Sequence, residues 1–147
     1  MDIQLHPITK NNWEDCISLK VKGDQVGYVA SNLYSLAESK FEPSFLPLGI
    51  YGDGEMIGFV MIGKDPSDQV DWILRYMIGQ EHQEKGKGKA ALDVILSYMS
   101  SRMDASRYLL LGVKPNNLQA KSLYEKAGFF FTGKLEPGEE IYRLDLL

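Results

Sequence analysis

The chain has 147 residues and a formal net charge of -4, with 44% hydrophobic and 24% charged residues. This length predicts one domain, spanning residues 1–147. The balance excludes a disordered chain as the main state, and no apolar run approaches the roughly 18 residues that a membrane helix needs. An excess of acidic side chains suits nucleic acid poorly, because phosphates attract basic surfaces.

Residues that bind metals through sulfur or imidazole are scarce. Cys16 is the only cysteine, and His6 and His82 are the only histidines. These numbers exclude an internal disulfide, a thiolate zinc cage and a histidine-rich metal site, so we expect no metal. The opening residues MDIQLHPITK lack the charged head and apolar middle of a signal peptide, which predicts a cytoplasmic protein.

The first elements are predicted to be a strand and a helix. Residues 3–8 can form a short edge strand, where Pro7 is tolerated. Asn11, followed three residues later by Glu14, indicates a helix cap, and apolar residues recur at helical spacing from Trp13 to Val21. We therefore expect a first helix beginning after Asn11, which Gly23 and Gly27 then interrupt.

The middle of the chain alternates between a helix and strands. Ser31 is predicted to cap a second helix that runs to about Lys40. Two β-rich runs then flank Asp53-Gly54, a dipeptide that favours a tight hairpin turn. Residues 70–78 are nearly continuously apolar and indicate a central strand.

The C-terminal part repeats a strand and helix pattern. An apolar stripe of period 3.6 predicts a long helix from about Ala90, and residues 108–113 predict a second buried strand. Asn117 can cap a further helix, Gly128 is well placed to end it, and one or two strands complete the chain. The predicted fold class is α/β or α+β, a mixed sheet with helices on both faces.

A glycine-rich turn separates the central strand from the long helix. Its sequence from residue 83 to 90 is QEKGKGKA. Glycines allow the backbone to approach a ligand closely, and the first N–H groups of the next helix have no partner within it. The helix dipole and three lysines, Lys85, Lys87 and Lys89, favour a negative ligand. The turn therefore predicts a phosphate site.

Three nucleotide-binding motifs can be compared with this turn. No stretch of the sequence supplies a P-loop. Gly86, Gly88 and Ala91 match the loose dinucleotide fingerprint, but the acidic residue near the required distance, Asp104, precedes the next strand and does not end it. The better description is Q-x-x-G-x-G, and at this point the sequence resembles the GNAT superfamily of acetyl-CoA-dependent N-acetyltransferases.

A second motif at the right distance strengthens this resemblance. The segment NLQAKSLYEKAGF, residues 117–129, follows the second buried strand and resembles the next helix of the family. The N-terminal segments NNWEDCISLKV and VASNLYSLAESKF look more weakly like the bacterial spermine/spermidine acetyltransferase subgroup. The resemblance implies a mostly antiparallel sheet in which two parallel strands splay apart.

The resemblance also implies positions for acetyl-CoA. The pantetheine arm would enter between the splayed strands and pair with the backbone of Met77 and Ile78. Asn117 would contact the arm and Lys121 would reach the phosphates. The turn that would cover the pyrophosphate comprises Gln83, Glu84, Lys85, Gly86, Lys87, Gly88 and Lys89. Glu84 departs from the family pattern, where a small residue is common, and its carboxylate must point to solvent.

The chemistry requires a proton donor for the leaving thiolate and a base for the attacking amine. Tyr124 matches the tyrosine that protonates sulfur in many members of the family. The sequence does not identify the base, and three carboxylates are candidates for this role: Asp71, Glu81 and Glu38.

An ammonium-bearing acceptor needs carboxylates and aromatic faces, which Tyr34, Glu38 and Trp72 would supply. Trp72 is equally compatible with a place in the core.

The leading interpretation is transfer of an acetyl group from acetyl-CoA to a primary amine by direct attack in a ternary complex. Small polyamines such as spermidine and spermine are the leading acceptors, by analogy with the resembled subgroup. A protein N-terminus or an aminoglycoside is an alternative acceptor, and a non-catalytic acyl-CoA-binding sensor is an alternative function. Dimers are common in the family, so a homodimer is possible.

Overall fold

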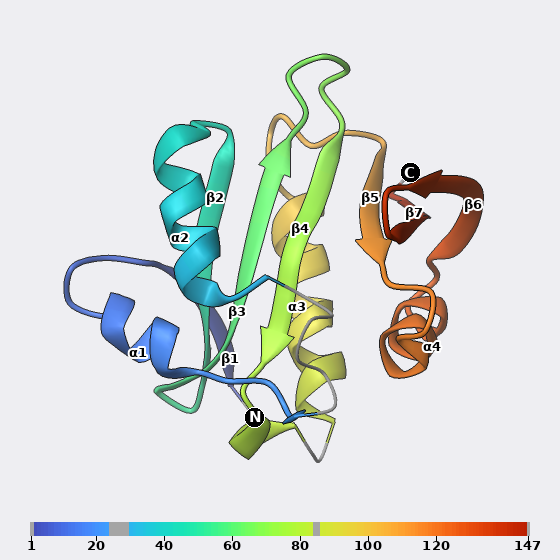
Figure 1. The fold of residues 1–147 in the computed structure, drawn as a ribbon. Helices are drawn as coiled ribbons and strands as arrows, with labels where there is room; N and C mark the ends of the chain where they lie inside the picture. Colours follow the sequence, from blue (N-terminus) through green and yellow to red (C-terminus); the bar gives the residue numbers. More distant parts are fainter. Residues whose placement is uncertain (1, 24–29, 84–85, 147) are drawn as a thin grey trace.

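A computed structural model describes residues 2–23, 30–83 and 86–146. In these residues, seven strands form one sheet in the order β1-β2-β3-β4-β5-β7-β6 (Figure 1). The strands are β1 (Ile3–Pro7), β2 (Phe45–Gly52), β3 (Glu55–Lys64), β4 (Asp71–Ile78), β5 (Tyr108–Val113), β6 (Phe130–Glu136) and β7 (Glu139–Asp145). The helices are α1 (Trp13–Ser18), α2 (Asn32–Phe41), α3 (Lys87–Ser100) and α4 (Leu118–Lys126), with a short 3₁₀ helix, η2 (Gln80–His82).

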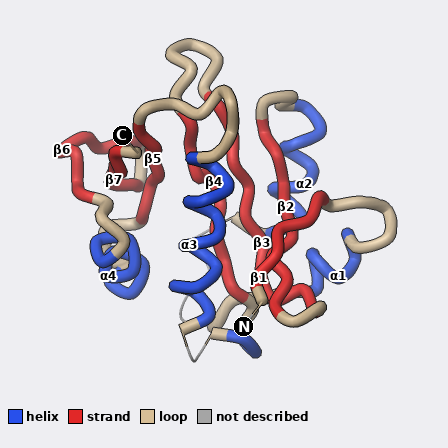
Figure 2. The backbone as a smooth tube through the Cα atoms, turned by 180° about the vertical axis from the view of Figure 1, so that it is seen from behind, coloured by secondary structure: helices blue, strands red, loops and turns tan. Residues whose placement is uncertain are grey.

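Helices cover both faces of the sheet, as predicted. Helices α1 and α2 lie on one face and α3 lies behind the other (Figures 1 and 2). One buried cluster, which includes Cys16 of α1 and Met77 of β4, lies on the α1 and α2 face. A larger cluster on the α3 face includes Ile95 of α3 and Tyr124 of α4. Burial of apolar surface on both faces makes the central strands nearly continuously hydrophobic.

The predicted turns and caps are mostly confirmed. Asp53 and Gly54 join β2 to β3 with φ angles of 51° and 86°, the left-handed conformation that a two-residue hairpin turn requires. The Ser31 side chain accepts a hydrogen bond from the Tyr34 amide at 3.1 Å and caps α2. Gly128, with φ 108°, ends α4.

The first helix differs from its prediction at both ends. Asn12 precedes Trp13 as the cap residue, so the cap predicted at Asn11 was wrong by one position. The helix also ends at Ser18, before Val21, because Leu19 is extended with ψ 131°. Beyond it, the Lys20 carbonyl accepts a hydrogen bond from the Gln80 amide at 2.6 Å, which holds the chain against η2. Gly27 lies outside the described residues.

The only parallel neighbours in the described sheet, β4 and β5, separate along their length. They pair at three positions, of which the last joins Ile73 to Leu111. Beyond Ile73, β4 continues to Ile78, and its only strand partner among the described residues is β3. The splayed parallel pair in a mostly antiparallel sheet is therefore confirmed.

The described residues were searched for membrane-spanning helices and for metal-binding groups. None of the described helices has both the length and the apolar character needed to cross a membrane. The described residues also hold no group of three or more His, Cys, Asp or Glu arranged to bind a metal ion.

Candidate active site

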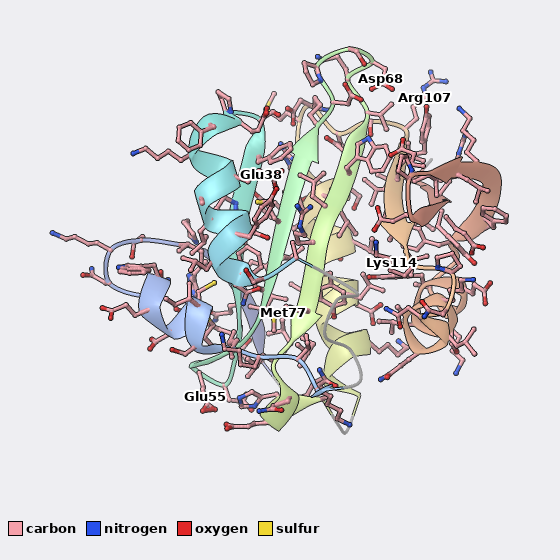
Figure 3. All side chains as sticks on the ribbon, in the orientation of Figure 1. Glu38, Glu55, Asp68, Met77, Arg107 and Lys114 are labelled. Atoms are coloured by element: carbon pink, nitrogen blue, oxygen red, sulfur yellow. The ribbon has the colours of Figure 1, made fainter. Side chains whose placement is uncertain are left out.

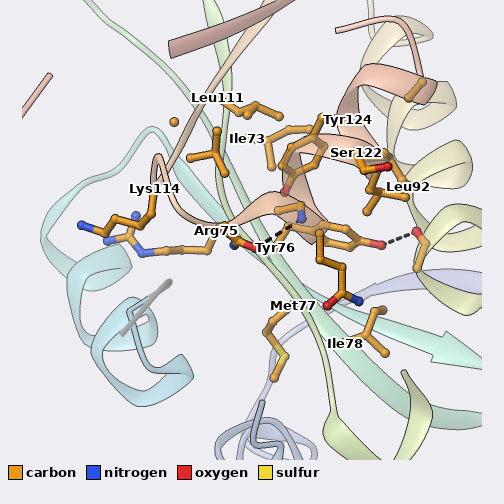
Figure 4. Close-up of a pocket in the computed structure, with 18 of the residues that line it drawn as sticks. Ile73, Arg75, Tyr76, Met77, Ile78, Leu92, Leu111, Lys114, Ser122 and Tyr124 are labelled. Carbon is orange, nitrogen blue, oxygen red and sulfur yellow. Dashed lines mark hydrogen bonds between the residues drawn. The ribbon is translucent and has the colours of Figure 1, made fainter. Parts of the chain in front are cut away.

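A cavity of about 1160 Å³ opens between the separated ends of β4 and β5. Strand β4 lines one side, and β5, α4 and the start of β7 line the other (Figures 3 and 4). Past Ile73, the edge of β4 that faces the cavity has no strand partner among the described residues. Its backbone groups are available to an extended ligand that carries amides, as in strand addition.

A β-bulge lies where the two strands part. Arg75 pairs with Met61 and Ile73 pairs with Ile62, which leaves Leu74 as an extra residue in β4. A bulge re-aims the side chains that follow it. The Arg75 side chain consequently reaches α2 on one face, where its Nη2 donates to Glu38 Oε1 at 2.9 Å.

The turn before α3 has the open backbone that an anion needs. Gly86 has φ 73° and precedes α3 without any side-chain cap. A Cβ on Gly86 would meet nothing within 4 Å, and one on Gly88 would meet only the Tyr76 hydroxyl at 3.9 Å. Among the described residues, the first helical hydrogen bond runs from the Ala90 amide to the Gly86 carbonyl. The amides before Ala90 are therefore free of helical partners and can bind an anion.

The polar side chains of the turn differ in their surroundings. Gln83 lines the cavity, and its side-chain amide donates to the Ile78 carbonyl at 2.7 Å. Lys89 also lines the cavity and pairs with Asp93 at 3.1 Å. Lys87 begins α3 but does not line the cavity. Two further predicted residues, Glu84 and Lys85, lie outside the described residues.

Tyr76 connects the strand to this turn. Its hydroxyl donates a hydrogen bond to the Gly88 carbonyl at 2.5 Å (Figure 4). Burial raises the pKa of Tyr76 well above the usual range of a tyrosine, so the hydroxyl keeps its proton. The bond fixes the second glycine of the turn relative to β4.

Helix α4 brings a second tyrosine to the cavity. Tyr124 is 8% exposed and lines the cavity, with its ring packed edge-on against Phe129 at 5.6 Å. In Figure 4 its hydroxyl is directed toward the β4 side. Burial raises the pKa of Tyr124 far above its usual range, which keeps the hydroxyl neutral and able to donate a proton.

Asn117, which precedes α4, and Lys121 of α4 are also predicted to contact the cofactor, and the structure places them differently. Asn117 lines the cavity, and its side chain also caps α4 by accepting from the Ala120 amide at 3.2 Å. Lys121 does not line the cavity. Its ammonium is held by Glu140 at 2.7 Å, and this hydrogen bond raises the pKa of Lys121.

None of the three carboxylates considered as a base lines this cavity. Asp71 is fully buried at the paired end of β4, where it forms an ion pair with Lys64 at 3.0 Å. Glu81 lies in η2 and lines a different, smaller hollow. Glu38 lies on α2 and is paired with Arg75, which itself lines the cavity.

The aromatic residues suggested for the acceptor also lie outside the cavity lining. Tyr34 is 60% exposed on α2, and Trp72 lies in the part of β4 that is paired with β5. Sequence reasoning missed many cavity-lining residues, among them Arg75, Tyr76, Lys114 and Glu139. Strand alternation around Met77 could have found the first two, whereas Glu139 depends on a long-range strand pairing that no local signal reveals.

Comparisons with known proteins agree with this geometry. The model of the Acetyltransferase (GNAT) family matches residues 11–129. The chain is 30% identical to the spermine/spermidine N(1)-acetyltransferase of Bacillus subtilis (strain 168), over 96% of this chain and 97% of that protein.

Two solved structures share the fold. The PaiA N-acetyltransferase of Thermoplasma acidophilum, in complex with coenzyme A, has a TM-score of 0.73 and 20% identity over 99% of both chains. The spermidine N-acetyltransferase of Vibrio cholerae, in complex with CoA and spermine, has a TM-score of 0.73 and 18% identity over 96% of this chain and 92% of that chain.

The open turn before α3 and the unpaired edge of β4 fit a ligand with a diphosphate and an amide-bearing arm. The chain belongs to the acetyltransferase (GNAT) family. It is an acetyl-CoA-dependent N-acetyltransferase, and acetyl-CoA is its co-substrate.

Proposed function

We propose that the acceptor of the acetyl group is a small polyamine such as spermidine or spermine. The observation that carries this proposal is the 30% identity to the Bacillus subtilis spermine/spermidine N(1)-acetyltransferase over 96% of the chain. The net charge of -4 is consistent with it, because an acidic protein attracts a chain of ammonium groups.

In the proposed complex, the diphosphate of acetyl-CoA binds the backbone amides at the start of α3. The turn residues from Gln83 to Lys89 surround it, and the arm runs along the β4 edge at Met77 and Ile78. This arrangement places the thioester near the point where β4 and β5 separate. Lys121 contributes only if its ion pair with Glu140 opens on binding.

The proposed reaction is a direct attack in a ternary complex. The neutral amine attacks the thioester carbon, and a free backbone amide of β4 can stabilise the oxyanion that develops. Tyr124 then donates its proton to the sulfur as the C–S bond breaks. The neutral, buried hydroxyl of Tyr124 in the cavity wall supports this role.

The distal ammonium of a polyamine has accessible partners on α2. Tyr34 is 60% exposed, and the Glu38 side chain is 29% exposed. We propose that a long acceptor extends from the cavity toward this helix, where a carboxylate and an aromatic face attract cations. Trp72 is left out of this contact because it lies on β4, in the part that is paired with β5, and not on α2.

A thiol-release assay with a panel of acceptors tests the proposed function. The panel contains spermidine, spermine, a peptide with a free N-terminus and an aminoglycoside, with acetyl-CoA in excess. Fully acetylated spermidine, which lacks a primary amine, is the control. The only cysteine, Cys16, is buried and adds little background to thiol detection.

The expected result is that a polyamine has the highest kcat/KM and that mass spectrometry shows an added acetyl group on its nitrogen. A higher kcat/KM for the peptide or the aminoglycoside would replace the proposed acceptor. Tight binding of acetyl-CoA by isothermal titration calorimetry, without turnover of any amine, would favour a sensor module.

A further inference from the structure

Two carboxylates are among the described residues that line the active-site cavity, Asp93 and Glu139. Asp93 lies on α3 and pairs with Lys89 at 3.1 Å, beside the turn proposed for the diphosphate. Glu139 lies at the start of β7, and the described residues supply no ion pair to it. Glu139 is therefore the cavity carboxylate that is not already neutralised by a neighbour.

A glycine makes room for this carboxylate. Leu111 and Val113 of β5 are buried in the cluster on the α3 face. Because side chains alternate along a strand, Gly112 faces the opposite side, toward α2. A Cβ on Gly112 would lie 2.5 Å from Glu139 Oε1. The Glu139 carboxylate thus occupies the space that a side chain on β5 would otherwise fill.

The alternation of β7 places Glu139 on the same face. Its neighbour Glu140 points the other way and pairs with Lys121 of α4 at 2.7 Å. Across the cavity, Arg75 reaches Glu38 of α2. Glu139 therefore lies on the α2 face of the sheet, and Tyr124 belongs to the opposite face, in the cluster with α3.

Along the strands, the position of Glu139 matches the position expected for the thioester. The last parallel pair joins Ile73 to Leu111, and Gly112 is the next residue of β5. Glu139 therefore lies at the point where the strands separate. Figure 4 shows the side chains of Ile73 and Leu111 close to that of Tyr124, and all three residues line the cavity.

We propose that Glu139 is the general base of the acetyl transfer and acts on the face opposite to Tyr124. The acceptor ammonium gives one proton to the Glu139 carboxylate. The neutral nitrogen forms the C–N bond, and the C–S electron pair leaves with the sulfur, which takes the Tyr124 proton. The second nitrogen proton returns to the tyrosine through water, and Glu139 releases its proton to solvent. This step rests on the proposed function for the position of the thioester, the role of Tyr124 and the identity of the amine.

The other charged groups on this face favour the same step. Arg75, paired with Glu38, lines the cavity, and so does Lys114, whose Nζ would lie 3.1 Å from a Cβ on Gly138. Fixed cations near an ammonium favour loss of its proton, because the neutral amine is not repelled. The Glu38 carboxylate offsets the charge of Arg75, so Lys114 is the cation that, together with Glu139 as the base, would favour the neutral nucleophile.

The test compares Glu139→Gln with Glu136→Gln as a matched control. Glu136 is paired with Glu139 across the β6–β7 hairpin, is exposed and does not line the cavity. Steady-state kinetics are measured from pH 7 to pH 10, acetyl-CoA binding is measured by calorimetry, and folding is checked by thermal melting.

The expected result is a loss of about 100-fold in kcat for E139Q at pH 7, the usual range for removing a general base. Its affinity for acetyl-CoA should stay unchanged. The loss should shrink as the pH approaches the pKa of a free alkyl amine, about 10, because the neutral amine then forms without a base. E136Q should match the wild type at every pH.

Three results would overturn the proposal. They are a wild-type kcat in E139Q, a change confined to the KM of the amine, and a loss of kcat that is the same at every pH. If E139Q does not fold, the variant Glu139→Asp tests the proposal instead. A reduced kcat in that variant would support the role of Glu139 as the base, and a wild-type kcat would contradict it. If another amine but no polyamine is turned over, the proposed acceptor fails and the comparison is made with that amine. Turnover of no amine would overturn both proposals.

Discussion

The Tyr76 hydroxyl donates a hydrogen bond to the Gly88 carbonyl at 2.5 Å and thereby ties the middle of β4 to the turn that begins α3. These two elements would hold different parts of one ligand, the arm along the strand and the diphosphate at the turn. A fixed distance between them lowers the cost of ordering the protein when that ligand binds.

The change Tyr76→Phe should weaken acetyl-CoA binding and leave the ring packing in place. Removal of one hydrogen bond is expected to cost about 1 kcal/mol of folding stability, or a few degrees in Tm. The Kd for acetyl-CoA, measured by calorimetry, should rise about threefold to tenfold. Tyr108→Phe is the control, because Tyr108 contacts Arg143 through its ring and does not line the cavity. Equal Kd values for Y76F and the wild type would contradict this role of the bond.

The change Gly88→Val should harm binding far more than folding. A Cβ at Gly88 meets only the Tyr76 hydroxyl at 3.9 Å, so the free protein has space for a side chain. The added bulk would instead block the approach of a phosphate to the backbone. Loss of one backbone hydrogen bond to a charged group, about 1.5–3 kcal/mol, corresponds to a rise in Kd of about tenfold or more.

Ser97→Val provides the control for this substitution, because it puts the same residue on an exposed position of the same helix. G88V and S97V should have similar Tm values but different affinities for acetyl-CoA. Gly86 is a less suitable position, because its φ of 73° would strain any other residue and confound binding with stability. An unaltered affinity in G88V would place the diphosphate elsewhere.

The change Tyr124→Phe separates proton donation from packing. The ring and its contact with Phe129 remain, but the sulfur loses its proton donor. We expect kcat to fall about 100-fold and the Kd for acetyl-CoA to change little. An unchanged kcat would exclude Tyr124 as the acid.

The raised pKa of Tyr124 also predicts how the free energy of unfolding changes with pH. Burial holds the folded tyrosine neutral, whereas the unfolded one ionises near pH 10. Above about pH 10 the unfolded state therefore binds fewer protons, so the free energy of unfolding should fall as the pH rises. Urea unfolding at pH 9 and pH 11 measures this fall, which should be smaller in Y124F than in the wild type.

The sequence revealed those parts of the fold that local chemistry determines. The Asp53-Gly54 turn, the Ser31 cap and the stop at Gly128 are each set by one or two residues whose backbone preference no distant contact opposes. The end of α1 was predicted too late because the chain after Ser18 is extended and the Lys20 carbonyl accepts from Gln80 of η2, a contact that periodicity cannot reveal.

The sequence points to the proposed cofactor half of the site more directly than to the proposed acceptor half, for a related reason. The turn and the first residues of α3 are contiguous in sequence, so their spacing is visible. The proposed acceptor half would combine residues of α2, β4 and β7, which only long-range contacts bring together. Glu139 comes close to Gly112 only because β7 runs antiparallel to β5 with Val113 opposite Glu140.

Asp71 should prove to be a structural residue. It is fully buried, accepts a hydrogen bond from the Ser106 amide at 2.9 Å and forms an ion pair with Lys64 at 3.0 Å. The Lys64 side chain is 16% exposed and keeps its hydrogen bond to the Asp104 carbonyl, whereas the Ser106 amide loses its partner. Asp71→Ala should therefore lower the free energy of unfolding by about 1–3 kcal/mol. Urea denaturation measures this loss.

The kinetics of the same variant discriminate between a structural carboxylate and a base. At a temperature where D71A is folded, its kcat should stay close to the wild-type value, because Asp71 lies at the paired end of β4 and outside the cavity. Asp68→Asn is the control, since Asp68 is exposed in the preceding turn and an amide oxygen can still accept from the Val70 amide. A fall of about 100-fold in the kcat of folded D71A, the size expected for loss of a base, would restore Asp71 to the reaction and remove that role from Glu139.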